Sequence, residues 1–126
     1  MKDSDFKIMV MSAINKLLAQ GEQSREEYNG GCMYRNNKGL CCVVGFMMDD
    51  ETAKKADAEG EASITGVVSA GIWGEDLSDA QVNQLYKMQG CHDFVDPSKP
   101  FNEEFIRGVN AERDLLWVAE YIGARG

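Results

Sequence analysis

The residues best suited to covalent chemistry in this sequence are its four cysteines and its single histidine. A cysteine becomes a nucleophile when a neighbouring base lowers its pKa or takes its proton. Cys42 and His92 could form such a pair, and Asp93 or Asp96 could orient the imidazole. A small buried thiol and a histidine at a helix end explain the same residues without any activity. The sequence therefore favours structural roles for Cys32 and Cys42 and predicts no catalytic residue.

Two groups of residues have the side chains of metal ligands. The first combines three cysteines with the histidine and consists of Cys32, Cys42, Cys91 and His92. Its spacing is irregular, and two adjacent residues such as the last two seldom point at one tetrahedral ion. The second group is the acidic run 49–51, which lacks a calcium-loop pattern and suits the first turn of a helix. We therefore predict no metal and no other cofactor.

Tyr34 and Arg35 are the residues best suited to hold an anionic ligand. An arginine can clamp a phosphate or carboxylate through two hydrogen bonds, and a tyrosine can stack beside it. The glycine-rich stretch 30–39 would add contacts to the phosphates of a nucleotide. The alternative is a structural arginine paired with Asp49 or Asp93. The sequence contains no phosphate-binding loop, dinucleotide fingerprint or serine-hydrolase motif.

Helices must position most of these residues. Apolar residues at helical spacing predict a helix over 4–20, which the following glycine ends. Shorter helices are predicted over about 50–58 and 63–72. A capping box and a hydrophobic staple mark a helix start at Ser78. A last helix is predicted to be capped by Asn102.

The segment 32–48 has a different pattern. Residues 32–35 are a strand candidate, and residues 36–39 favour a turn because asparagine and glycine tolerate positive φ. The run 40–48 is almost continuously apolar, as in a buried strand. We therefore predict one domain over 1–126 of the α+β class, dominated by helices. Four or five helices should pack around one short β-hairpin.

Charge and composition limit the expected partners. The chain has 126 residues and a formal net charge of −8. Such a surface repels phosphate backbones, so direct binding to nucleic acid is not expected. No apolar run reaches the roughly 18 residues of a membrane span, and the N-terminal segment lacks the features of a signal peptide. The four cysteines include no Cys-x-x-Cys pair, so neither a zinc ribbon nor a thioredoxin-like site is expected. Seven methionines and the lack of a secretory signal suit a reducing compartment, so we expect a cytoplasmic protein.

A pattern of spaced residues runs through the central segment. It reads Cys-x-Tyr-Arg, a short turn ending in Gly, Cys-x-x-Gly, an acidic residue and a later His-Asp pair. The residues concerned are Cys32, Tyr34, Arg35, Gly39, Cys42, Gly45, Asp49, His92 and Asp93. This pattern resembles that of a family of small bacterial and bacteriophage proteins over about residues 15–96. The chain departs from the family pattern at 36–38 and at Cys41, where lysine is common.

The resemblance implies a phage or prophage origin and no established activity. Small acidic phage proteins without catalytic motifs often bind a host factor, so we expect a non-enzymatic inhibitor of a host defence protein. The expected binding residues are Tyr34, Arg35, Gly39, Asp49, His92 and Asp93. Two alternatives stay open: a sponge for a nucleotide signal that uses Tyr34 and Arg35, and a cysteine-dependent enzyme that uses Cys42 and His92. A host protein is the expected partner, with a small nucleotide or a homodimer as further options.

Overall fold

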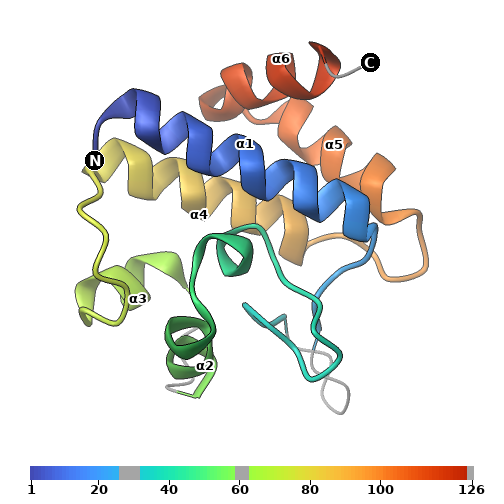
Figure 1. Ribbon diagram of the computed structural model, residues 1–126. Helices are drawn as coiled ribbons and strands as arrows, with labels where there is room; N and C mark the ends of the chain where they lie inside the picture. The colour runs from blue at the N-terminus through green and yellow to red at the C-terminus, as the bar shows by residue number, and fades with distance from the viewer. Residues whose placement is uncertain (26–31, 59–62, 125–126) are drawn as a thin grey trace.

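The computed structural model describes residues 1–25, 32–58 and 63–124, and helices make up the regular structure in these ranges (Figure 1). Six α-helices and two short 3₁₀-helices occur there. In chain order the elements are α1 (Asp3–Gln20), η1 (Val44–Met47), α2 (Asp50–Ala58), α3 (Ile64–Ser69), α4 (Asp79–Asp93), α5 (Phe101–Ala111), η2 (Arg113–Leu115) and α6 (Leu116–Ala124). None of the described helices combines the length and the apolar character needed to cross a membrane.

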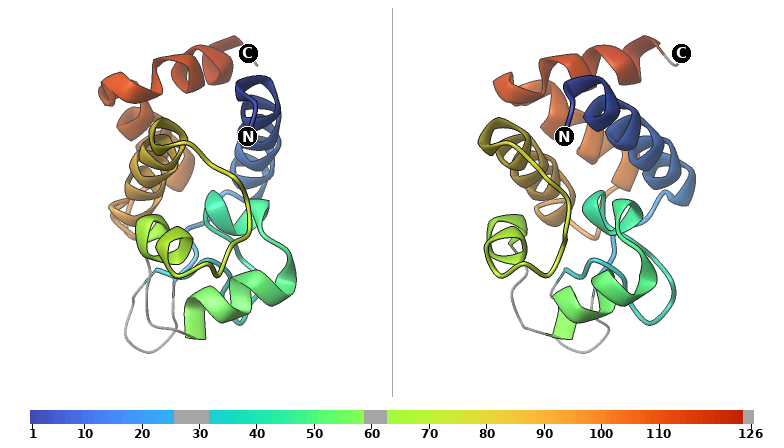
Figure 2. Two further views of the ribbon diagram at one scale, coloured as in Figure 1. Left: turned by 90° about the vertical axis from the view of Figure 1, so that its left-hand side faces the viewer. Right: turned by 60° about the vertical axis from the view of Figure 1, so that its left-hand side comes forward.

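The longer helices surround a hydrophobic cluster, and the short elements η1, α2 and α3 gather below them in Figure 1. Helix α5 packs against α4 and α6, α3 packs against α4, and η1 packs against α1. Figure 2 shows α1 and α4 on two different sides of the molecule. Both helices direct fully buried side chains inward, among them Phe6 and Ile14 of α1 and Leu85 and Met88 of α4. This cluster fixes the positions of α1 and α4 relative to each other.

Several helix boundaries agree with the prediction from local sequence signals. Helix α1 covers the predicted range 4–20 and ends at Gly21, which has a left-handed φ of 70°. Helix α2 coincides with the predicted range 50–58. Ser78 caps α4 in a capping box with Gln81, in which each side chain bonds the other residue's backbone N–H. Short-range capping chemistry is sufficient to place these ends.

The C-terminal helix differs from its prediction. Pro100 occupies the N-cap of α5, and Asn102 lies inside the helix. The Asn102 side chain instead donates a hydrogen bond to the Leu18 carbonyl oxygen at 3.0 Å, which ties α5 to the end of α1. Glu112 then adopts an extended backbone, with φ −98° and ψ 111°, so the predicted single helix is divided into α5 and α6.

The predicted β-hairpin at 32–48 is wrong, and so is the α+β class. Residues 36–39 do form a turn, which Gly39 completes with a φ of 83°. An isolated bridge joins Arg35 and Cys41, after which the chain coils into η1 instead of extending as a strand. An uninterrupted apolar run fits a buried helical turn as well as a buried strand. The described ranges therefore hold six α-helices and no β-strand, in place of four or five helices around a hairpin.

Candidate functional site

Tyr34, Cys42 and Gly45 bring two parts of the sequence motif into close contact. The Cys42 N–H donates to the Tyr34 carbonyl oxygen at 3.2 Å, and the Gly45 N–H donates to the Cys42 sulfur at 3.3 Å. A Cβ atom at Gly45 would overlap the same Tyr34 carbonyl group. Position 45 therefore requires glycine, because η1 approaches the preceding segment through bare backbone.

The Arg35 side chain is engaged by groups within the chain. Its Nη2 atom donates to the carbonyl oxygens of Gly45 at 3.1 Å and Met48 at 3.2 Å, at the end of η1. Its Nη1 atom pairs with Asp50, at the start of α2, and not with Asp49 or Asp93 as expected. These contacts make Arg35 the link between η1 and α2, and they occupy the guanidinium that a ligand clamp would need.

Two acidic residues of this region also accept hydrogen bonds from backbone N–H groups. The Asp49 carboxylate accepts a hydrogen bond from the Thr52 N–H at 2.7 Å, which caps α2 and lowers the pKa of Asp49. The Asp57 carboxylate accepts from the N–H groups of Tyr34 at 2.9 Å and Arg35 at 3.1 Å. Burial raises the pKa of Asp57, while the two N–H donors act in the opposite direction. Helix α2 thus anchors the motif segment.

The remaining residues of the expected nucleotide site are not arranged for ligand contact. Tyr34 is 1% exposed, and burial raises the pKa of its hydroxyl well above the usual range. A buried ring cannot stack on a ligand that arrives from solvent. Gly39 completes the turn, where its N–H donates to the Asn36 carbonyl oxygen at 3.1 Å. Residues 30 and 31 of the glycine-rich stretch lie outside the described ranges.

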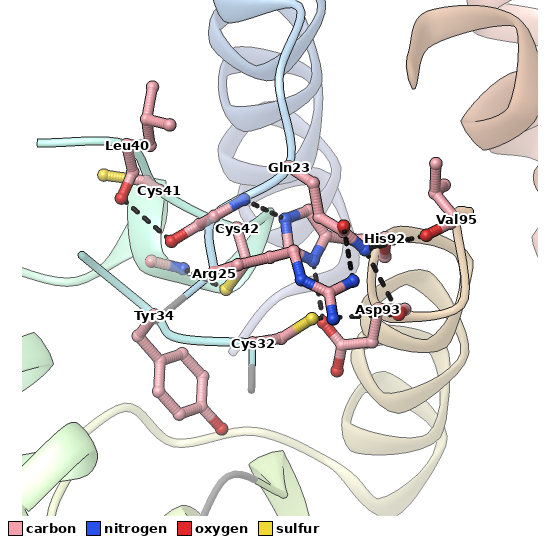
Figure 3. A network of polar contacts seen from close by, with 12 residues as sticks. Gln23, Arg25, Cys32, Tyr34, Leu40, Cys41, Cys42, His92, Asp93 and Val95 are labelled. Carbon is pink, nitrogen blue, oxygen red and sulfur yellow. Dashed lines mark hydrogen bonds and ion pairs between the residues drawn. The ribbon is translucent and has the colours of Figure 1, made fainter. Parts of the chain in front are cut away.

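His92 and Asp93, at the end of α4, form the centre of a buried polar cluster (Figure 3). The His92 ring is fully buried, and its Nε2 atom accepts the backbone N–H of Ser24 at 2.9 Å. The ring proton therefore sits on Nδ1, which donates to Asp93 Oδ1 at 2.7 Å. Gln23 Nε2 donates to the carbonyl oxygens of His92, Asp93 and Val95 at 2.8, 3.2 and 3.2 Å. The cluster binds the segment after α1 to the end of α4.

The geometry does not support a nucleophile–base pair of Cys42 and His92. Cys42 is fully buried, and desolvation raises the pKa of its thiol far above the ordinary value. Thiolate formation is therefore suppressed at neutral pH. The lone pair on His92 Nε2 accepts the Ser24 N–H, and Nδ1 already carries a proton. Neither nitrogen is available to take a proton from a thiol.

Cys32, His92 and Asp93 also have the atoms of a metal site, and these atoms all lie within 4.8 Å of one another. A metal on His92 Nδ1 would require the ring proton on Nε2, where the Ser24 N–H already donates. Burial, followed by the charge of Asp93, raises the pKa of the Cys32 thiol to about 12. The Cys32 thiol donates to the Asp93 carbonyl oxygen at 3.7 Å. The arrangement fits a hydrogen-bonded cluster better than a metal site.

A cleft of about 540 Å³ lies between α4 and α5. One wall carries Tyr86 and Phe94, two residues that are 53% and 90% exposed. Gly90 lies between them on α4, and Glu104 and Gly108 line the cleft from α5. Such exposure of large aromatic side chains beside a cleft is typical of a binding surface.

Of the six residues predicted to bind a ligand, only Asp93 lines this cleft. Sequence reasoning did not single out the aromatic residues of the wall. One signal was available, since Tyr86, Gly90 and Phe94 are spaced by four residues and so share a helix face. That face differs from the one that buries Leu85 and Met88.

The described structure thus offers two candidate regions: the motif with its polar cluster, and the α4–α5 cleft. No family model, curated protein or solved structure matches the chain. The resemblance to the bacterial and bacteriophage family therefore stays a prediction.

Proposed function

We propose that the chain is a non-enzymatic binding protein, encoded by a phage or prophage, that inhibits a host protein in the bacterial cytoplasm. The observation that carries this proposal is the 90% exposure of Phe94 at the edge of the α4–α5 cleft. Burying a phenylalanine side chain is worth about 1.5–3 kcal/mol. Exposed aromatic residues of this kind are frequent energetic centres of protein interfaces. The origin and the inhibitory role rest on the family resemblance.

The internal contacts of the motif count against the two alternatives. A nucleotide sponge would need Tyr34 and Arg35, but Tyr34 is buried and Arg35 binds carbonyl oxygens and Asp50. A cysteine-dependent enzyme would need Cys42 and His92, whose reactive atoms are buried and hydrogen-bonded. A partner protein at the cleft requires no change in any of these contacts.

Native mass spectrometry of the protein purified from host lysate tests the proposal when two matched variants are compared. Phe94→Ser removes the exposed aromatic group of the cleft, and Ile8→Ser removes a residue on α1 that is 62% exposed. A stoichiometric host protein should accompany the wild type and Ile8→Ser but not Phe94→Ser. A partner that is retained by all three proteins would contradict the proposed surface.

The same experiment separates the alternatives. A retained small molecule with no protein partner would favour the sponge. Substrate turnover that disappears in Cys42→Ser, in a variant that still melts cooperatively, would establish the enzyme and end the binding-protein proposal.

A further inference from the structure

We infer that the α4–α5 cleft receives a basic amphipathic helix of the partner protein, with an apolar side chain seated over Gly90. This inference rests on the proposed function and specifies the chemistry of the partner. Three features of the cleft support it: the position of Gly90, the spacing of the aromatic residues, and the charge of the lining.

Gly90 has no role in the backbone or in packing that would require glycine. It does not have a positive φ, and an added Cβ would meet only the Phe94 ring, at an ordinary contact distance of 3.8 Å. An interior helical glycine nevertheless costs stability relative to alanine. Gly108, across the cleft, differs because a Cβ there would lie 3.3 Å from the Cys91 sulfur, so close helix packing explains it. Gly90 lines the cleft, and because it has no side chain it leaves space there that another residue would fill.

Tyr86 and Phe94 stand on either side of this hollow. The three positions 86, 90 and 94 follow one face of α4, with Phe94 as its C-cap residue. They span about two helical turns, or roughly 12 Å. Two aromatic walls around a glycine floor match the packing of one large side chain into a groove, as when an amphipathic helix docks.

The lining of the cleft carries a net negative charge, which favours a basic occupant over an acidic one. Its lining contains three carboxylates, Asp93, Glu104 and Glu112, against a single lysine, Lys87. Lys87 pairs with Glu112 at 3.5 Å, and Glu104 lies 3.8 Å from the mostly exposed Arg107. The chain as a whole carries −8. Lysine or arginine residues beside the apolar anchor would match this surface, whereas a second copy of this acidic chain would be repelled.

Titration of the purified protein with two synthetic helical peptides tests the inference. One peptide contains leucine and lysine, and the other has glutamate in place of each lysine. The leucine–lysine peptide should bind at one site, perturb the amide resonances of residues 86–94, and weaken roughly tenfold or more in high salt. The leucine–glutamate peptide should not bind.

Protein variants show whether binding uses the cleft. Gly90→Leu fills the hollow and should abolish binding, while Gly123→Ala in α6, where an added Cβ meets nothing within 4 Å, should leave it unchanged. Binding that survives Gly90→Leu, or equal binding of both peptides, would overturn the inference. If the host complex still requires Phe94 in that case, the proposed function stands. If the host complex is indifferent to Phe94, the proposed function itself fails.

Discussion

At the scale of single residues, the side chains of Arg35 and His92 form hydrogen bonds with backbone groups, and Gly45 leaves space for one. Gly45 leaves room for the Tyr34 carbonyl, Arg35 donates to two carbonyl oxygens, and His92 accepts the Ser24 N–H. Backbone groups buried without partners are costly, so these contacts stabilise the fold. Changes in the motif should therefore appear first as lost stability, whereas changes at Phe94 should appear as lost binding.

Gly45→Ala should be strongly destabilising. The new methyl group would overlap the Tyr34 carbonyl, and only a shift of the backbone could relieve the overlap. We expect a loss of about 3 kcal/mol, at the upper end of the range for overpacking. Urea denaturation followed by circular dichroism measures the loss. Gly123→Ala is the control and should not destabilise, because nothing lies within 4 Å of its added Cβ. Equal midpoints for the two variants would contradict the proposed contact.

The Cys42 thiol should make the protein sensitive to alkaline pH. Burial raises its pKa in the folded state far above 9.0, the value of an unburied thiol, which applies to the unfolded chain. Below pH 9 the thiol is protonated in both states, and its contribution to stability is complete. Above pH 9 the Cys42 proton is lost from the unfolded state alone, so this thiol lowers the free energy of unfolding by about 1.4 kcal/mol per pH unit.

Urea denaturation at several values between about pH 8 and 11, run on wild type and Cys42→Ala, checks this prediction, because this range spans the pH at which the unfolded thiol loses its proton. The stability of Cys42→Ala should fall less steeply above pH 9. Cys32 and Tyr34 add further declines in both proteins, from 9.0 and 10.0 respectively, because burial raises their pKa values as well. Identical slopes for the two proteins would mean that Cys42 is accessible to solvent.

At the scale of elements, hydrogen bonds between side chains and backbone groups connect helices that are too short to be stable in isolation. The 3₁₀-helix η1 has four residues and α2 has nine, lengths at which isolated helices are marginal. Arg35 binds the end of η1 and the start of α2, and Asp57 binds the segment that carries Arg35. Arg35 and Asp57 therefore connect η1, α2 and the segment before η1 to one another.

Arg35→Met should release η1 from α2. The hydrogen bonds to the Gly45 and Met48 carbonyls are partly buried, and their loss should cost about 2 kcal/mol. Asp50→Asn removes the ion pair alone and should cost less than about 0.5 kcal/mol, since the Asp50 side chain is 97% exposed. Thermal melting of both variants provides the test. If Asp50→Asn is as damaging as Arg35→Met, the ion pair and not the carbonyl contacts joins the helices.

Gly90→Ala should make α4 more stable and the cleft less functional. Alanine favours the helix interior by about 0.8–1.0 kcal/mol over glycine, and the added Cβ meets no clash. The same methyl group reduces the depth of the cleft, so binding of the leucine–lysine peptide should weaken. Melting curves and peptide titration on one protein sample measure both effects. A variant that is stabilised and still binds with full affinity would show that the glycine does not serve the partner.

The sequence was informative where local chemistry decides the structure. The capping box at Ser78 and the stop at Gly21 place α4 and α1. The run 40–48 was wrongly predicted to be a strand, because its coiling into η1 depends on Arg35 and on the backbone of Tyr34. The cleft escaped prediction for a related reason: the exposure of an aromatic residue depends on which helices pack nearby.

The candidate polar cluster was only half predictable. His92 and Asp93 were selected together, and they do share a hydrogen bond. The decisive partner of His92 is the Ser24 N–H, which lies 68 positions earlier in the chain. Any residue other than proline offers such a donor, so no residue type at position 24 could reveal it.

At the scale of the whole molecule, the charge of −8 and the acidic cleft have separable effects on binding. Long-range attraction by a charged surface raises the rate of association, while contacts within the interface set the rate of dissociation. A basic partner would therefore be attracted by the entire surface and held by the cleft. Two double variants of equal net charge can distinguish these contributions.

Glu104→Gln with Glu112→Gln neutralises two carboxylates of the cleft, and Asp5→Asn with Glu75→Gln neutralises two exposed carboxylates outside its lining. Both variants carry two fewer negative charges, so association with the leucine–lysine peptide should slow in both. Only the cleft variant loses contacts to the bound lysines, so dissociation should accelerate, roughly tenfold, in that variant alone. Stopped-flow fluorescence measures both rate constants. High salt should abolish the difference in association rate between wild type and the two variants. If dissociation accelerates equally in the two variants, the bound peptide is held by the overall charge of the chain and not by the α4–α5 cleft.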